Sequence, residues 1–157
     1  MEILYGAIIG DIIGAPYEGD DHTVKTKNFK IFKRGSHFTD DTVMTIAVAD
    51  ALLTCEGFDE GSIKATVTKS MQRWGCDYPY AGYGHGFKGW LRAYDPQPYK
   101  SSGNGAAMRV SGVALLGKLY GDLNLVREVA RWTAAVTHDH PEGVKGAESV
   151  ASAIFLA

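Results

Sequence analysis

The chain has 157 residues, enough for one domain with a sizeable core. Hydrophobic residues make up 45% and charged residues 22%, which is typical of a folded globular protein and excludes a disordered one. The formal net charge of −2 gives no general attraction to nucleic acids or to anionic membranes.

The first predicted element is a buried apolar helix over Ile3–Ala15, ended by Pro16. Asp11 lies within this helix and needs a partner, because an unpaired buried carboxylate is costly. Glycines recur on one face at four-residue spacing, at Gly6, Gly10 and Gly14. Each lowers helix propensity by about 1 kcal/mol, which indicates tight packing or space kept for a ligand. Glu18 follows in a turn that is rich in glycine and aspartate.

Features that bear on cellular location favour the cytoplasm. The apolar run Ile3–Ala15 is too short to span a membrane, and it lacks the basic leader of a signal peptide. The two cysteines, Cys55 and Cys76, match no metal-binding spacing and are most simply reduced thiols.

The second predicted helix runs from Asp40 to Leu53, with Thr39 as its N-cap. Two interpretations of Thr39, Asp40 and Asp41 are equally good from the residues alone. A threonine cap with carboxylates in the first turn stabilises a helix by roughly 0.3–2 kcal/mol. The same hydroxyl and carboxylates are the hard oxygen ligands that Mg²⁺ prefers.

A third helix is predicted over Ser62–Trp74, with Gly75 beyond its end. The following segment mixes glycine with aromatic residues from Tyr78 to Trp90, and one short helix is predicted around Phe87–Tyr94. Aromatic rings on glycine-rich loops suit a planar ligand, and a packed loop that covers the core is an equally good interpretation.

The loop Ser101–Gly105 leads into a predicted helix that runs to Tyr120 and is closed by Gly121. A small-residue loop that opens a helix exposes backbone N–H groups, which favours phosphate binding. Asp122 is predicted to cap the next helix, which ends near Thr137, and Pro141 begins the last one. Six or seven helices and no strand predict an all-α fold, with residues 1–157 forming one compact multi-helix domain.

Four groups of residues, in this order, resemble the ADP-ribosylglycohydrolase family. They are Gly10-Asp11 with Glu18, then Phe38-Thr39-Asp40-Asp41-Thr42, then Gly103-Asn104-Gly105-Ala106-Ala107-Met108-Arg109, and finally Thr137-His138. The resemblance covers essentially the whole chain. It implies an all-α orthogonal bundle and a hydrolase that cleaves the glycosidic bond between ADP-ribose and an acceptor, with two Mg²⁺ ions or sometimes Mn²⁺.

The resemblance also implies roles for individual residues. Thr39, Asp40 and Asp41 are the expected metal ligands, and Glu18 is the expected acid near the scissile bond, with Asp40 and Asp41 sharing the catalytic role. The residues expected to contact ADP-ribose are Ser101, Ser102, Gly103, Asn104, Gly105, Met108 and His138. Ser102 stands where some relatives carry an aromatic residue that stacks on adenine, so the segment from Tyr78 to Trp90 is the candidate for that contact.

The chain departs from the family pattern at one point, because nothing in it matches a second acidic motif of the Asp-x-Asp-Thr type. We therefore expect the domain to resemble only the N-terminal part of a family member, with one weakly held ion or none and little hydrolysis by this chain alone. We also expect an exposed apolar face that includes part of Val150–Leu156, and self-association or pairing with a complementing chain. The alternatives are a catalytically inactive ADP-ribose-binding or helical interaction protein, or an unrelated Mg²⁺ phosphohydrolase.

Overall fold

The computed structural model describes residues 2–18 and 25–157, and these residues form helices without a strand. The α-helices are α1 (Glu2–Gly14), α2 (Asp40–Thr54), α3 (Glu60–Asp77), α4 (His85–Arg92), α5 (Gly105–Met108), α6 (Ser111–Tyr120), α7 (Leu123–Ala135) and α8 (Pro141–Leu156). A short 3-10 helix, η1 (Ala15–Tyr17), follows α1. The predicted all-α fold is confirmed, and the described part of the chain has eight α-helices in place of six or seven.

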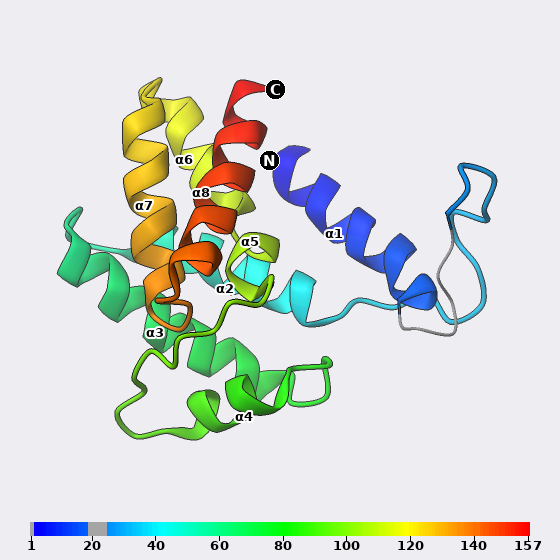
Figure 1. The fold of residues 1–157 in the computed structure, drawn as a ribbon, viewed down its shortest axis with the longest axis horizontal. Coiled ribbons are helices and arrows are strands. Elements are labelled where there is room, and N and C mark those ends of the chain that lie inside the picture. Colours follow the sequence, from blue (N-terminus) through cyan, green and yellow to red (C-terminus); the bar gives the residue numbers. More distant parts are fainter. Residues whose placement is uncertain (1, 19–24) are drawn as a thin grey trace.

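Helix α2 is the centre of the core. It packs against α1, α3 and α6, while α7 packs lengthwise against α8 (Figure 1). The inner face of α2 is buried completely or almost completely, at Val43, Met44, Ala47, Val48 and Ala51. A buried α2 fixes the position of its own N-terminus, where Asp40 and Asp41 lie.

The predicted helix boundaries that depend on local signals are confirmed. The Thr39 side chain accepts a hydrogen bond from the Asp41 N–H, and the Asp122 side chain accepts bonds from the first turn of α7. Gly121 ends α6 with a positive φ of 68°, a conformation that glycine adopts without strain. Pro141 is the first residue of α8, where its missing N–H costs nothing.

Two predicted boundaries are wrong because packing overrides the local signal. Gly75 does not end α3 but lies inside it, and a Cβ there would be 2.5 Å from Leu91 Cδ2, so the glycine lets α4 approach closely. The helix predicted to run to Tyr120 is broken near Arg109, which separates α5 from α6 and lets the arginine side chain turn into the interior.

The prediction that α1 is a buried helix is also wrong, since none of its described residues is buried. Tyr5 and Ile9 are 58% and 46% exposed, and nothing lies within 4 Å of a Cβ built on any of its three glycines. Large apolar side chains are exposed on α8 too, at Val150 and Leu156. Within the described ranges, no helix is both long enough and apolar enough to cross a bilayer.

The aromatic segment after α3 mostly covers the core. Tyr83, Phe87 and Trp90 are buried, Phe87 stacks on Trp90, and the Trp90 indole N–H donates to the Val136 carbonyl at 3.0 Å. Of the two interpretations of this segment, the packed cover describes these three rings. Tyr80, by contrast, is almost fully exposed.

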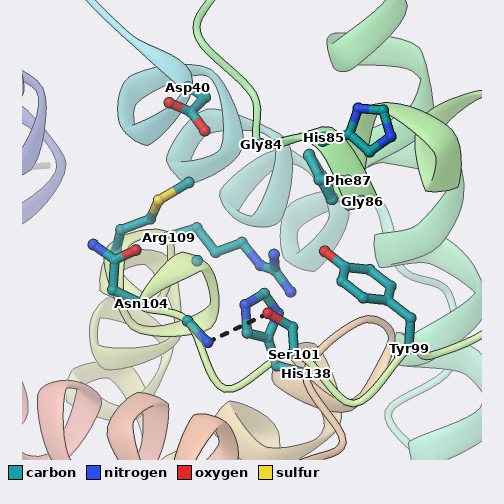
Figure 2. A pocket seen from close by; sticks show the side chains of 13 residues that line it. Asp40, Gly84, His85, Gly86, Phe87, Tyr99, Ser101, Asn104, Arg109 and His138 are labelled. Carbon is teal, nitrogen blue, oxygen red and sulfur yellow. Dashed lines mark hydrogen bonds between the residues drawn. The ribbon is translucent and has the colours of Figure 1, made fainter.

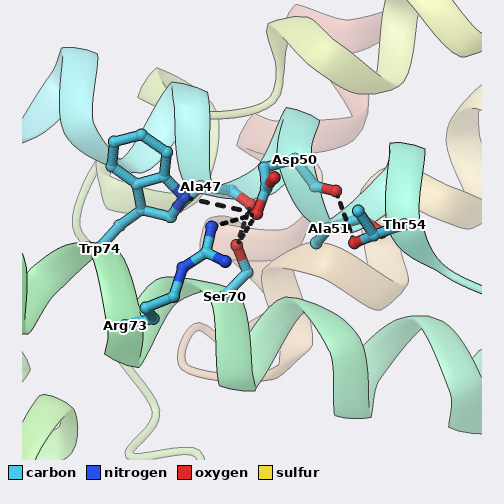
Figure 3. Close-up of polar contacts among 7 residues, drawn as sticks. All are labelled: Ala47, Asp50, Ala51, Thr54, Ser70, Arg73 and Trp74. Atoms are coloured by element: carbon cyan, nitrogen blue, oxygen red, sulfur yellow. Dashed lines mark hydrogen bonds and ion pairs between the residues drawn. The ribbon is translucent and has the colours of Figure 1, made fainter.

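Helices α2 and α3 are joined by a polar contact on Asp50 (Figure 3). Its Oδ2 accepts hydrogen bonds from Ser70 Oγ at 3.0 Å, Arg73 Nη2 at 2.7 Å and Trp74 Nε1 at 3.4 Å. Asp50 thus collects three donors from one face of α3.

Replacing Asp50 with alanine is expected to lower the free energy of unfolding by about 1 kcal/mol, because the donors of α3 lose a charged acceptor that is only partly exposed. Urea denaturation measures the change. Glu60→Ala is the matched control, because its ion pair with Lys64 is exposed and such pairs contribute a few tenths of a kcal/mol. Equal effects of the two changes would contradict this account of Asp50.

Candidate functional site

A cleft of about 260 Å³ opens between the N-terminus of α2, the start of α4 and the loop before α5 (Figure 2). Asp40 contributes from α2, and His138 from the segment between α7 and α8. The remaining lining residues are Gly84, His85, Gly86, Phe87, Tyr99, Ser101, Gly103, Asn104, Gly105, Met108 and Arg109. Residues from distant parts of the sequence therefore share one cavity.

His138 lies directly beside the glycines of the loop. A Cβ on Gly105 would be 2.9 Å from His138 Cε1 and 3.0 Å from Nε2, and one on Gly103 would be 4.0 Å from Nε2. The absence of side chains at these two positions lets the loop backbone pack closely against the histidine ring, which lines the cleft although the residue is only 4% exposed. Burial lowers the pKa of His138 to about 4, with the nearby Arg109 charge acting in the same direction, so the ring is neutral at pH 7.

The loop itself is held by several hydrogen bonds. The Lys100 N–H donates to Asp139 Oδ1 at 2.6 Å, and the Tyr99 N–H donates to the Thr137 carbonyl at 3.2 Å. The Gly103 N–H donates to Ser101 Oγ at 3.3 Å (Figure 2). One of the N–H groups expected to serve a phosphate is thus already paired, and the helix that follows is only four residues long.

A second group of polar residues surrounds the N-terminus of α2, where Asp11 finds the partners that its position requires. Asp11 Oδ2 accepts the Thr39 N–H at 2.8 Å and the Thr42 N–H at 3.2 Å. The hydroxyl groups of both threonines also donate to its carboxylate, Thr39 at 2.7 Å. Asp11 therefore ties α1 to the first turn of α2.

The carboxylates of Asp40 and Asp41 lie in a field of negative charge. Burial raises the pKa of Asp40, and the charges of Asp11 and Glu18 raise it further. Burial raises the pKa of Asp41 to about 6, with Asp40, Asp11 and Glu18 acting in the same direction. A nearby Lys88 lowers the pKa of Asp40 but ranks behind these effects. A cation bound between these carboxylates would reduce their mutual repulsion and favour their ionised form.

The residues at this point fit Mg²⁺ by chemistry. The Thr39 hydroxyl donates a hydrogen bond to Asp11 and accepts one from the Asp41 N–H, which leaves one oxygen lone pair free, and two carboxylates follow it in the chain. Across residues 2–18 and 25–157, however, no three histidine, cysteine or acidic side chains gather closely enough to hold a metal by themselves. Thr39, Asp40 and Asp41 therefore amount to part of a metal site.

The residues expected from the sequence divide between these two places. Asp40 and His138 line the same cleft, as do Ser101, Gly103, Asn104, Gly105 and Met108. Thr39 and Asp41 flank Asp40 at the α2 N-terminus without lining the cleft, and Glu18 is exposed just after η1. Ser102 is exposed and is not part of the lining.

Sequence reasoning gave no role to Arg109, Thr137 or Tyr99, although they surround His138. Arg109 is only 2% exposed and lies beside the cleft with its guanidinium near His138 and Tyr99 (Figure 2). One signal for Arg109 was available, since it is the only charged residue between Lys100 and Lys118 and thus stands in an apolar run. Nothing local marked Tyr99.

Comparison with known proteins adds a family relationship. The model of the ADP-ribosylglycohydrolase family matches residues 1–157. ADP-ribosylhydrolase ARH3 of Mus musculus is 33% identical to this chain over 182 aligned residues, which cover 98% of this chain and 47% of that protein. ADP-ribosylhydrolase ARH3 of Homo sapiens is 31% identical, over 98% of this chain and 48% of that protein. The chain spans about half the length of these curated relatives.

Proposed function

Because this chain belongs to the ADP-ribosylglycohydrolase family, we propose that its cleft binds ADP-ribose and that it acts in hydrolysing the glycosidic bond between ADP-ribose and an acceptor. The observation that carries the proposal is the convergence of Asp40, the loop Ser101–Gly105 and His138 on one cleft. The relatives named above, whose names describe ADP-ribosylhydrolases, support the same reaction class.

The loop side of the cleft suits the diphosphate. Gly103 and Gly105 allow a ligand to approach the backbone, and the buried positive charge of Arg109 lies beside them. Tyr99, which is 39% exposed, supplies aromatic surface for a planar base at the other side, where Phe87 lines the cleft as part of the packed cover. Typical small-molecule pockets have volumes of roughly 300–1,000 Å³. A cleft of about 260 Å³ therefore suits part of ADP-ribose better than the whole molecule.

The α2 side of the cleft suits bond cleavage. Cleavage at the anomeric carbon builds an oxocarbenium-like positive charge, which an ionised carboxylate at Asp40 would stabilise. Glu18 is close enough for its charge to act on Asp40, and we propose that it accepts the proton of the attacking water. Thr39 and Asp41 would hold a Mg²⁺ or Mn²⁺ ion together with Asp40. When bound there, the ion would orient the ribose hydroxyls and activate a water.

We further propose that the protein is cytoplasmic and that its partners are ADP-ribosylated proteins or small molecules. Cys55 and Cys76 are free thiols, which agrees with a reducing compartment. The net charge of −2 gives the protein no general attraction to nucleic acid, which agrees with these partners.

Calorimetric titration with ADP-ribose tests the binding step. Binding is expected in wild type, and Gly105→Val is expected to weaken it at least 10-fold, equivalent to about 1.4 kcal/mol. The physical reason is that a side chain at position 105 would clash with the His138 ring and displace two residues that line the cleft. Gly89→Val is the matched control, because Gly89 lies on α4 outside the cleft with open space around it. Absence of binding in wild type would reject the proposal.

Hydrolysis is tested by release of free ADP-ribose from a panel of ADP-ribosylated acceptors, with Mg²⁺ and with chelator. Release that requires Mg²⁺ supports the hydrolase. Binding of ADP-ribose without release from any acceptor would instead establish the inactive binding protein as the function of this chain.

A further inference from the structure

The guanidinium of Arg109 is a buried positive charge at the edge of the cleft, and it has no acidic partner among the described residues. Arg109 is 2% exposed, and burial lowers its pKa to about 10, so the guanidinium remains charged at pH 7. Its Nη2 donates to the Thr133 carbonyl at 3.1 Å and to Thr137 Oγ1 at 2.9 Å. In the described ranges no carboxylate forms an ion pair with it. Burying an arginine without a carboxylate partner costs free energy, so we expect Arg109 to have a function that accounts for this cost.

Thr137 passes the effect of Arg109 to the neighbouring histidine. Its side chain is fully buried, and Oγ1 lies 2.9 Å from the arginine Nη2 and 2.6 Å from His138 Nδ1. A guanidinium can only donate, so the threonine oxygen accepts from Arg109. Among described neighbours, His138 Nδ1 is then the one acceptor within reach of the hydroxyl proton. Because a buried hydroxyl proton without an acceptor is costly, this contact favours an Nδ1 that accepts and carries no proton.

The proton of the neutral ring must consequently be on Nε2. This nitrogen faces the glycine loop, since a Cβ on Gly105 would be 3.0 Å from it. The Nε2–H group thus points from the protein interior towards the glycine loop, and Gly103 and Gly105 line the same cleft as His138.

We propose that Arg109 is a positioning residue, which acts through the Thr137 hydroxyl to hold His138 in the Nε2–H tautomer so that His138 donates a hydrogen bond to an anionic oxygen of the bound ligand. The identity of that oxygen as one of the ADP-ribose diphosphate rests on the proposed function, but the tautomer does not. The groups that face the ring are Arg109, Tyr99 and Asp139. Asp139 is exposed and its carboxylate accepts the Lys100 N–H, so it does not compete for the ring nitrogen.

The arrangement gives the site a donor of fixed direction. A histidine that exchanged its proton between both nitrogens would present an acceptor to the ligand part of the time, and an anionic oxygen would be repelled. A low pKa of about 4 keeps the ring neutral at pH 7, so the charge near the ligand comes from Arg109 while the hydrogen bond comes from His138. The Thr137 hydroxyl joins the two residues.

Long-range ¹H–¹⁵N NMR of the 157-residue chain without ligand tests the tautomer directly. The chain has five histidines, and the His138 signals are identified by their loss in His138→Gln. Wild type is expected to show a protonated Nε2 and an unprotonated Nδ1. A protonated Nδ1 in wild type would overturn the proposal, and this measurement needs no further variant to be decisive.

Two variants then test the link itself. Thr137→Val removes the hydroxyl at almost unchanged volume, and the Nδ1–H tautomer is expected to appear, with ADP-ribose bound about 10-fold more weakly than in wild type. Thr137→Ser keeps the hydroxyl and is expected to restore the wild-type tautomer and affinity. An unchanged tautomer in folded Thr137→Val would overturn the role of the threonine. Failure of wild type to bind ADP-ribose, with the tautomer as expected, would reject the proposed ligand and leave the positioning role standing.

Discussion

Asp41→Asn is expected to stabilise the chain by about 2 kcal/mol at pH 8 in the presence of chelator, an increase in melting temperature of roughly 4–8 °C. The pKa of Asp41 is raised from 3.8 to about 6, and each pKa unit corresponds to about 1.4 kcal/mol. We take less than the full difference because Asp41 is partly exposed. Loss of the favourable effect of a carboxylate in the first turn acts in the opposite direction, but it is smaller, about 0.3–1 kcal/mol.

The pH dependence of this effect has a definite sign. A raised pKa means that folded Asp41 binds its proton more readily than unfolded Asp41, so the ionised carboxylate destabilises the fold above pH 6. The penalty decreases as the pH falls through 6 and disappears below about 4. The stability difference between Asp41→Asn and wild type should therefore shrink over this range, as measured by thermal unfolding at several pH values.

Magnesium provides the second readout for Asp41. A cation that binds the folded chain raises its melting temperature, by an amount that grows with the cation concentration relative to its dissociation constant. We expect such an increase for wild type and a much smaller one for Asp41→Asn. Asp59→Asn is the matched control, because Asp59 caps α3 on the surface and its hydrogen bonds with Ser62 lower its pKa. If Asp41→Asn destabilised the chain in chelator as Asp59→Asn should, the carboxylate would be a helix cap and nothing more.

Local chemistry made the helix boundaries predictable. Thr39, Gly121 and Asp122 act through atoms only two to four residues away, so their effect does not depend on the rest of the fold. Gly75 could not be interpreted in this way. Its role depends on Leu91 approaching from another helix, and no spacing within α3 reveals that contact.

The site was predictable where its residues belong to short patterns. Asp40, the glycine loop and His138 were all expected at a common site, and the structure brings them to one cleft. Arg109 and Thr137 were missed as contributors because their task depends on hydrogen bonds between residues 28 positions apart. Such long-range contacts leave no periodicity in a sequence.

The exposure of α1 could not be predicted from the sequence either. Its apolar residues predict a buried helix, yet the described structure leaves Tyr5 and Ile9 well exposed. Periodicity indicates which side chains favour burial, but it does not indicate what surface is present to bury them. Asp11 is anchored all the same, because its threonine partners lie on the adjoining helix α2.

The packing at Gly117 on α6 should be especially sensitive to added volume, because at no other described glycine would a Cβ come as near to a neighbouring atom. A Cβ at this position would be 1.9 Å from Val126 Cγ2 of α7 and 3.1 Å from Phe155 Cδ2 of α8. Val126 is 1% exposed, and a β-branched side chain in a helix has one strongly preferred rotamer, so it has little freedom to move away.

Gly117→Ala is therefore expected to lower the free energy of unfolding by about 2–3 kcal/mol, measured by urea denaturation. The gain in helix propensity, about 1 kcal/mol, is smaller than the cost of forcing α6 and α7 apart. Gly89→Ala is the control, because Gly89 is also inside a helix but has open space around it, and we expect it to be neutral or slightly stabilising. The double variant Gly117→Ala with Val126→Ala should be more stable than the sum of the two single changes implies. The reason is that the methyl group added at position 117 would occupy the space left by the two methyl groups removed from Val126. Strict additivity in this cycle would show that Gly117 and Val126 do not share the space that the structure assigns to them.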